Sequence, residues 1–159
     1  MNFVVREMNL SELAPVIDLH IEGLEQELVL LNQIFPGKAV NREGCGTLAK
    51  LLTQIVESKE GQIFVGLAGS DYAGYCLVTK KVYPVEIPKF CGCINGIYIR
   101  DDYRRDKLGT RLFHEAVAWL KSQDVTYVEL YHMINDDRAA GFWRHMGFTP
   151  IQLNCAMKI

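Results

Sequence analysis

The sequence predicts an α/β domain, with a mixed sheet of six to seven strands that carries helices on both faces. Segments with the two-residue period of strands alternate along the chain with segments of helical period. A helical segment connects the strands expected at 93–99 and 127–133, which makes these two parallel through a right-handed crossover. Short loops join the earlier strands and favour antiparallel pairing. The 159 residues suit one domain over 1–159.

The amino-terminal part combines one short strand with two amphipathic helices. Three apolar residues at 3–5, followed by charged ones, are typical of a strand. Apolar residues then recur at steps of three and four over 10–31, the spacing of one helical face. This pattern fits one long helix or two helices broken near Gly23. The same spacing predicts another helix over 48–56.

Three strands are expected in succession in the middle of the chain. Apolar runs at 63–67 and 75–82 flank a polar turn at 69–71, which is typical of an antiparallel hairpin. Two prolines within 84–88 indicate a loop, and the third strand follows at 93–99.

The carboxy-terminal part returns to helical patterns. A helix is predicted over 108–120, and alternating residues predict a strand over 127–133. A short helix over 136–146 ends before Gly147, a residue favoured just past helix ends. A last strand, or a pair of strands, is expected over 148–158 and completes the six or seven.

The composition excludes several classes of protein. A net charge of −2 does not suit a general nucleic-acid binder. No apolar run approaches the roughly 20 residues of a membrane span, and the amino terminus does not resemble a signal peptide. We therefore expect a cytoplasmic protein without nucleic-acid or membrane partners, as a monomer or homodimer. The five cysteines form no CxxC pair, which predicts free thiols and no metal, although Cys91 and Cys93 leave a redox role open.

A basic turn is the most informative local feature of the chain. The strand at 93–99 leads into a polar turn that holds Arg104 and Arg105, and Gly109 follows where the next helix begins. Unpaired N–H groups and the helix dipole favour an anion at such a helix start. The turn therefore indicates a ligand that carries phosphate.

Two segments resemble the GNAT superfamily of acetyl-CoA-dependent N-acetyltransferases. The segment IYIRDDYRRDKLGTRLF is similar to the family's strand, turn and helix, with the pattern Arg/Gln-x-x-Gly-x-Gly/Ala running here from Arg104 to Gly109. The segment DDRAAGFWRHMGF is similar to Asn-x-x-Ala-x-x-Phe-Tyr-x-x-x-Gly-Phe. The likeness is strong over 91–149, and the first sixty residues match in element order alone. It implies a GNAT-like three-layer domain, an acyltransferase activity and acetyl-CoA as cofactor.

The resemblance also implies which residues contact the cofactor. The N–H groups from Arg105 to Thr110 would hold the pyrophosphate, with added charge from the basic side chains, each of which could equally be a solvated surface residue. Lys107 replaces the family's first glycine; a lysine fits there if its φ is negative, and its ammonium could reach a phosphate. Either Asn135 or Asp136 takes the place of the family's Asn. The implied cofactor contacts are Ile97, Tyr98, Ile99, Arg104, Arg105, Asp106, Lys107, Leu108, Gly109, Thr110, Asn135, Phe142 and Trp143.

A bulge is expected at Asn95-Gly96, where it would open a slot for pantetheine beside the strand. Ile99 would pair with the pantetheine amides like an added strand. At the short helix, Phe142 is expected to pack in the core, whereas Trp143 could line the thiol end of the slot.

Direct attack of an amine on the thioester, which the resemblance implies, needs a base, an oxyanion donor and an acid. The family's Glu on the strand before the turn is replaced by Asn95, which cannot act as a base. The family's Tyr is replaced by Trp143, which does not titrate. His132 is the best replacement base, with a structural or surface role as the alternative, and the N–H of Ile97 is expected to polarise the acetyl carbonyl. Weaker candidates for proton transfer are Tyr98, Tyr131 and Glu129.

Three functions are compatible with these residues. The first is an N-acetyltransferase that acts on a primary amine of a small molecule or peptide. The second is a weak or inactive CoA-binding module, which the missing Glu and Tyr favour. The third is a nucleotide-binding regulator, although the sequence has no GxxxxGK[ST] or GxGxxG loop.

Acceptor specificity is expected from the helices within 10–58 and the loop at 83–90. Acidic side chains there could attract a cationic amine or form a solvated helix face. They are Glu22, Glu25, Glu27 and Glu86.

Overall fold

The computed structural model describes residues 2–83 and 90–157, and its strands form one mixed sheet in the order β1-β2-β3-β4-β5. The strands are β1 (Val4–Glu7), β2 (Gly61–Ala68), β3 (Asp71–Val82), β4 (Phe90–Ile99) and β5 (Val128–Leu130). The first four pair antiparallel, whereas β4 and β5 are parallel. The mixed sheet, the hairpin and the parallel crossover are therefore confirmed.

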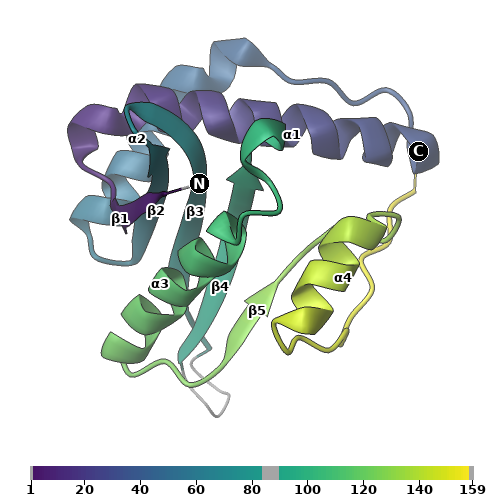
Figure 1. Ribbon diagram of the computed structural model, residues 1–159. Coiled ribbons are helices and arrows are strands. Elements are labelled where there is room, and N and C mark those ends of the chain that lie inside the picture. The colour runs from purple at the N-terminus through teal and green to yellow at the C-terminus, as the bar shows by residue number, and fades with distance from the viewer. Residues whose placement is uncertain (1, 84–89, 158–159) are drawn as a thin grey trace.

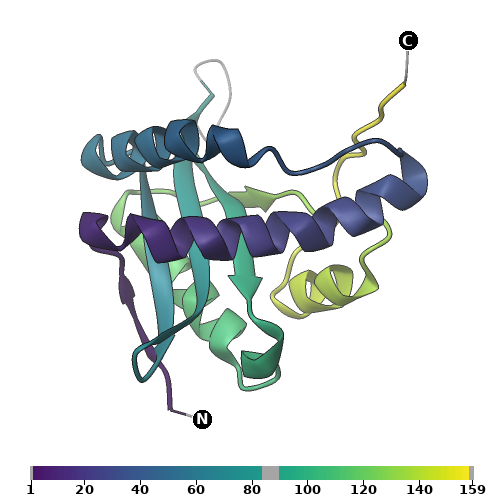
Figure 2. The ribbon, with the colours of Figure 1, turned by 90° about the horizontal axis from the view of Figure 1, so that it is seen from above.

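Helices cover both faces of this sheet (Figures 1 and 2). The helices are α1 (Leu13–Ile34), α2 (Cys45–Glu57), α3 (Leu108–Ser122) and α4 (Asp137–His145), with short 3-10 turns η1 (Leu10–Glu12), η2 (Arg42–Gly44) and η3 (Asp101–Tyr103). Neighbouring residues of β2 enter opposite cores: Ile63 and Val65 pack toward α1 and α2, whereas Phe64 packs toward α3. None of the helices in the described ranges is long and apolar enough to cross a bilayer.

Helix α1 continues without a break through Gly23. A Cβ at this position would lie 3.2 Å from the ring of Tyr98, so the glycine lets α1 pack closely on β4. The carboxylate of Glu22 accepts two hydrogen bonds from Arg100 at the end of β4, of 2.9 and 2.7 Å. Packing and this ion pair together compensate the roughly 1 kcal/mol that a glycine costs inside a helix.

The sheet has five strands, so the prediction of six to seven is wrong for the described residues. The segment expected as a last strand has no strand structure over 148–157, and residue 158 lies outside the described range, as does the loop predicted at 84–88. The tail buries no apolar face that would hold it against the sheet, because Ile151 and Leu153 are 71% and 72% exposed. Since β5 has only three residues, it also offers a short edge for pairing.

The bulge predicted at Asn95-Gly96 is confirmed. Leu77 of β3 pairs with Gly96 and Val78 pairs with Ile94, which leaves Asn95 as the extra residue. A bulge bends its strand. The pairing of β4 with β5 accordingly stops at Ile94, and the two strands diverge beyond it (Figure 1). This divergence also explains why the strand predicted at 127–133 is shorter in the structure.

Candidate active site

A cavity of about 480 Å³ lies where β4 and β5 separate. Helix α1 closes one side of it, and α4 and the start of α3 line the other. Most of the residues predicted as site residues line this cavity, although they come from two separate segments, within 95–110 and 132–143. Those in the lining are Asn95, Ile97, Tyr98, Ile99, Arg104, Arg105, Lys107, Leu108, Gly109, Thr110, His132, Phe142 and Trp143.

The turn before α3 has the backbone of an anion site. Arg105 and Lys107 both have positive φ, 69° and 62°. Left-handed residues within such a turn aim successive N–H groups at a common point, which is a recognised anion-binding geometry. The first bond of α3 runs from the N–H of Arg111 to the carbonyl of Lys107, at 3.0 Å. The N–H groups of Leu108, Gly109 and Thr110 therefore have no acceptor within the helix.

The negative φ that would suit a lysine at position 107 is not found. Lys107 is the N-cap of α3 and adopts φ 62° and ψ 11°, the left-handed conformation that glycine adopts without strain. The left-handed conformation of Lys107 forms the end of the turn that joins η3 to α3. Its side chain and that of Arg105 are exposed at the edge of the cavity, where both can reach a phosphate.

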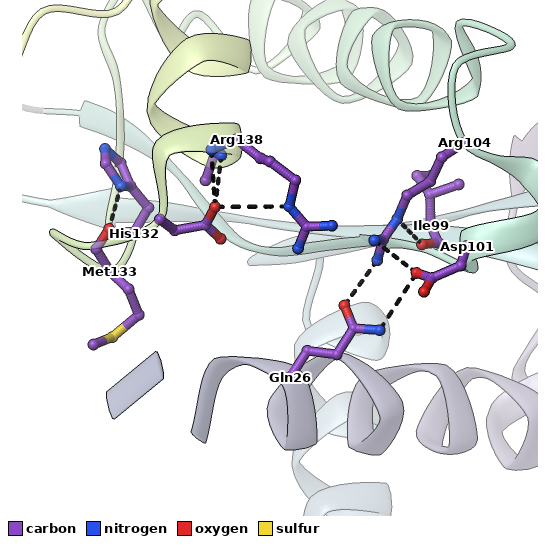
Figure 3. A network of polar contacts seen from close by, with 9 residues as sticks. Gln26, Ile99, Asp101, Arg104, His132, Met133 and Arg138 are labelled. Atoms are coloured by element: carbon purple, nitrogen blue, oxygen red, sulfur yellow. Dashed lines mark hydrogen bonds and ion pairs between the residues drawn. The ribbon is translucent and has the colours of Figure 1, made fainter. Parts of the chain in front are cut away.

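Arg104 has a different role from its two basic neighbours. Its guanidinium donates to the carbonyl of Ile99 at 2.8 Å and to Oε1 of Gln26 at 2.8 Å, and it pairs with Asp101 at 2.6 Å (Figure 3). It also lies 5.7 Å from the ring centre of Tyr98. These contacts brace the turn against α1, so that the side chain already has partners within the protein.

The free edge of β4 is suited to a pantetheine chain. The N–H of Arg100 bonds to the carbonyl of Ala73 in β3 at 2.9 Å. Since N–H groups alternate in direction along a strand, those of Ile99 and Ile97 point away from β3 into the opening. The N–H of Ile99 can thus bond to pantetheine, while its carbonyl is occupied by Arg104. The N–H of Ile97 points into the same opening, two residues further into the cavity.

The predicted catalytic side chains lie on opposite sides of the opening. On β4, Oδ1 of Asn95 accepts a 2.6 Å bond from Thr79. His132 follows β5, and its Nδ1 is 2.9 Å from the carbonyl oxygen of Met133. A carbonyl oxygen only accepts, so Nδ1 carries the proton and Nε2 remains available as a base. Figure 3 shows Arg138 of α4 between His132 and Arg104.

Of the two residues considered for the family's Asn position, Asp136 lines the cavity and Asn135 does not. Oδ1 of Asp136 caps α4 by accepting from the N–H groups of Arg138 and Ala139, at 3.1 and 3.0 Å. Asn135 instead donates to the carbonyl of Leu30 at 3.1 Å, which fixes the loop before α4 to the end of α1.

Both aromatic residues of α4 pack with the core and also line the cavity. Trp143 is only 6% exposed and packs edge-on against Phe113, Phe142 and Phe148, so it is a core residue. Phe142 is half-buried, and its ring lies 3.6 Å from the position of a Cβ on Gly109. Phe142 therefore forms the side of the cavity beside the phosphate turn.

Glu27 was expected only as an acidic side chain near the acceptor, and Tyr75, which does not line the cavity, lies next to it on the α1 side. Glu27 lines the cavity, and burial raises the pKa of its carboxyl, with a further increase from the charge of Asp136. Tyr75 lies under the bulge, 2.8 Å from the position of a Cβ on Gly96, and its hydroxyl is 2.8 Å from Nδ1 of His20. Burial raises the pKa of Tyr75 and lowers that of His20, so both are neutral near pH 7. The helical spacing of Gly23, Glu27 and Leu30 was the one available sequence signal.

The fold and the cleft define an α/β acyltransferase with a site for a CoA thioester. The chain belongs to the acetyltransferase (GNAT) family, whose characteristic sequence pattern matches residues 30–148. It is thus an acyltransferase of a family that uses acetyl-CoA. The resemblance seen in the sequence is confirmed by this match.

Solved structures share the fold along nearly the whole chain. A predicted acetyltransferase with acetyl-CoA from Clostridium acetobutylicum is 11% identical, with a TM-score of 0.82 over 99% of this chain and 96% of that one. A tetramutant of the BH1408 protein from Bacillus halodurans is 15% identical, with a TM-score of 0.79 over 98% and 99%. An aminoglycoside acetyltransferase from an uncultured soil sample, in complex with trehalose, is 17% identical, with a TM-score of 0.71 over 99% and 95%. No curated protein sequence matches the chain.

Proposed function

We propose that the protein transfers the acetyl group of acetyl-CoA to a primary amine of a small molecule or peptide, which attacks the thioester directly. The observation that carries this proposal is the single cavity that extends from the phosphate turn, along the free edge of β4, to the side of α1. Because both reactants reach one cavity, the amine nitrogen can approach the acetyl carbon without an intermediate carrier.

The residues of the chain supply binding and polarisation in this proposal. The N–H groups of the turn and the side chains of Arg105 and Lys107 bind the pyrophosphate. The N–H of Ile97 polarises the acetyl carbonyl and stabilises the negative charge that develops on its oxygen. His132 is a candidate to accept a proton through Nε2.

Calorimetry with acetyl-CoA, followed by thiol release across a panel of amines, tests the proposal. The panel should include diamines, aminoglycosides and peptides with a free amino terminus or lysine. Arg105→Ala should weaken acetyl-CoA binding, whereas Arg42→Ala, which removes an exposed arginine outside the cavity, should not. Absence of acetyl-CoA binding by the unaltered protein would refute the function.

A CoA-binding module with weak or no activity is the second candidate. It is favoured by Asn95 at the position of the family's Glu and by Trp143, which is buried and cannot titrate. Tight binding of acetyl-CoA without turnover of any amine in the panel would support this alternative.

A further inference from the structure

The carboxylate of Glu27 is placed in the cleft by the helical repeat of α1. In the first half of the helix, Val16 and Leu19 are buried against the sheet. Successive turns carry the same face beyond the edge of the core, where Gly23, Glu27 and Leu30 line the cavity. The face that builds the core at one end of α1 therefore builds the cleft at the other.

Glu27 differs from the neighbouring carboxylates of α1 in having no cation paired with it. Glu22 is bound by Arg100, and Glu25 pairs with Arg42 at 2.6 Å. Within the described ranges, no hydrogen bond or ion pair satisfies the carboxylate of Glu27. Protein atoms around the cleft nonetheless exclude part of its water, which together with Asp136 raises its pKa. A carboxylate that is reachable, unpaired and more basic than usual is suited to accept a proton.

We propose that Glu27 takes the proton from the ammonium group of the acceptor, and that the acceptor enters as a cation along α1. This inference rests on the function proposed above. The substrate ammonium gives one proton to Glu27, which later passes it to water. The nitrogen lone pair then forms the bond to the acetyl carbon. As the C–S bond breaks, the second nitrogen proton goes to the departing thiolate, so that charge and protons balance.

The groups around Glu27 define the expected pH dependence. Burial and the charge of Asp136 on α4 both favour the protonated carboxyl and raise its pKa, and Arg138 and Arg104 are the cations that line the same cavity. Tyr75 from β3 is neutral, and His132 across the opening is the competing base. Turnover should rise with pH as Glu27 ionises, in a step that lies above the usual range of a glutamate.

Glu27→Gln is the decisive variant. Glu25→Gln is the matched control, because Glu25 lies two residues away on the same helix and does not line the cavity. Loss of a general base lowers the rate about 10²- to 10⁴-fold. We expect Glu27→Gln to lower kcat by at least about 100-fold and to abolish the acidic limb of the pH profile, with unchanged acetyl-CoA affinity by calorimetry. Glu25→Gln should retain the kcat and the pH profile of the unaltered protein.

Two results would overturn the assignment of Glu27 without touching the function itself. One is acetyl-CoA binding together with a kcat of Glu27→Gln within about threefold of the unaltered protein. The other is activity that is lost in His132→Ala and kept in Glu27→Gln, which would make His132 the base.

If no amine in the panel is acetylated, carbon NMR of the Glu27 carboxyl in the CoA complex tests whether an amine binds beside Glu27. A saturable shift on addition of 1,4-diaminobutane supports the proposal, and the absence of a shift refutes it.

Discussion

The left-handed lysine at the start of α3 provides a prediction that separates backbone strain from charge. An L-residue pays about 1–2 kcal/mol in this conformation, which glycine avoids. Glycine in turn costs about 0.4–1 kcal/mol through the greater freedom of the unfolded chain. Lys107→Gly should therefore stabilise the fold by about 0.5–1 kcal/mol, which for a chain of this length raises Tm by about 2 °C.

Lys107→Ala is the matched variant, because it loses the ammonium and keeps the Cβ. If Lys107 contacts a phosphate, both variants lose about 1 kcal/mol of binding, or roughly fivefold in Kd for acetyl-CoA. Tm should rise in the glycine variant alone. Thermal unfolding and calorimetry measure the two effects on the same samples. A glycine variant no more stable than the alanine variant would show that the turn stores no strain at this residue.

Three further predictions concern the stability of the fold. Gly74→Ala should destabilise the fold by about 1–3 kcal/mol in urea unfolding, because the new Cβ would lie 2.5 Å from a backbone oxygen. Gly46→Ala should instead stabilise the fold, because the new Cβ would meet open space in α2. Equal effects of the two substitutions would contradict the geometry. A hydrogen bond from Arg6 holds the pKa of Glu12 at about 2, below its usual 4.5. The ionised carboxylate therefore contributes to the free energy of unfolding above pH 4.5, and this contribution is lost as the pH falls toward 2. Glu12→Gln should flatten stability against pH in that window, and an unchanged acid limb would argue against the contact. Trp143→Ala should cost about 3–5 kcal/mol of unfolding free energy, and a loss below about 1 kcal/mol would contradict its place in the core.

Local sequence patterns predicted the elements whose partners lie nearby. The hairpin of β2 and β3 and the bulge at Asn95 depend on neighbouring residues, and both are found. Residues 148–157 form no strand, because alternation of side chains does not guarantee a partner strand. Likewise, the continuity of α1 through Gly23 depends on the distant Tyr98, which no local pattern could indicate.

The part of the site that lies in one continuous segment was also predictable from the sequence. The phosphate turn is such a segment, because its basic residues and Gly109 follow one another in the chain. Glu27 reaches the cleft only because α1 packs across β4, which lies some seventy residues later in the chain. In the sequence, nothing distinguishes Glu27 from the other acidic residues of the same helix. The left-handed φ of Lys107 was also beyond local reasoning, since lysine rarely adopts that conformation.

The bracing of Arg104 joins the two halves of the cleft mechanically. One guanidinium holds both the phosphate turn, through Ile99, and the acceptor side, through Gln26, the residue next to Glu27. A phosphate that drew this guanidinium away would remove one of the three hydrogen bonds of Gln26, leaving those to Tyr98 and Asp101, and so weaken the hold on α1 beside the acceptor. Thermodynamic linkage is reciprocal, so an acceptor that held α1 in place would change the affinity of the turn for acetyl-CoA by the same factor.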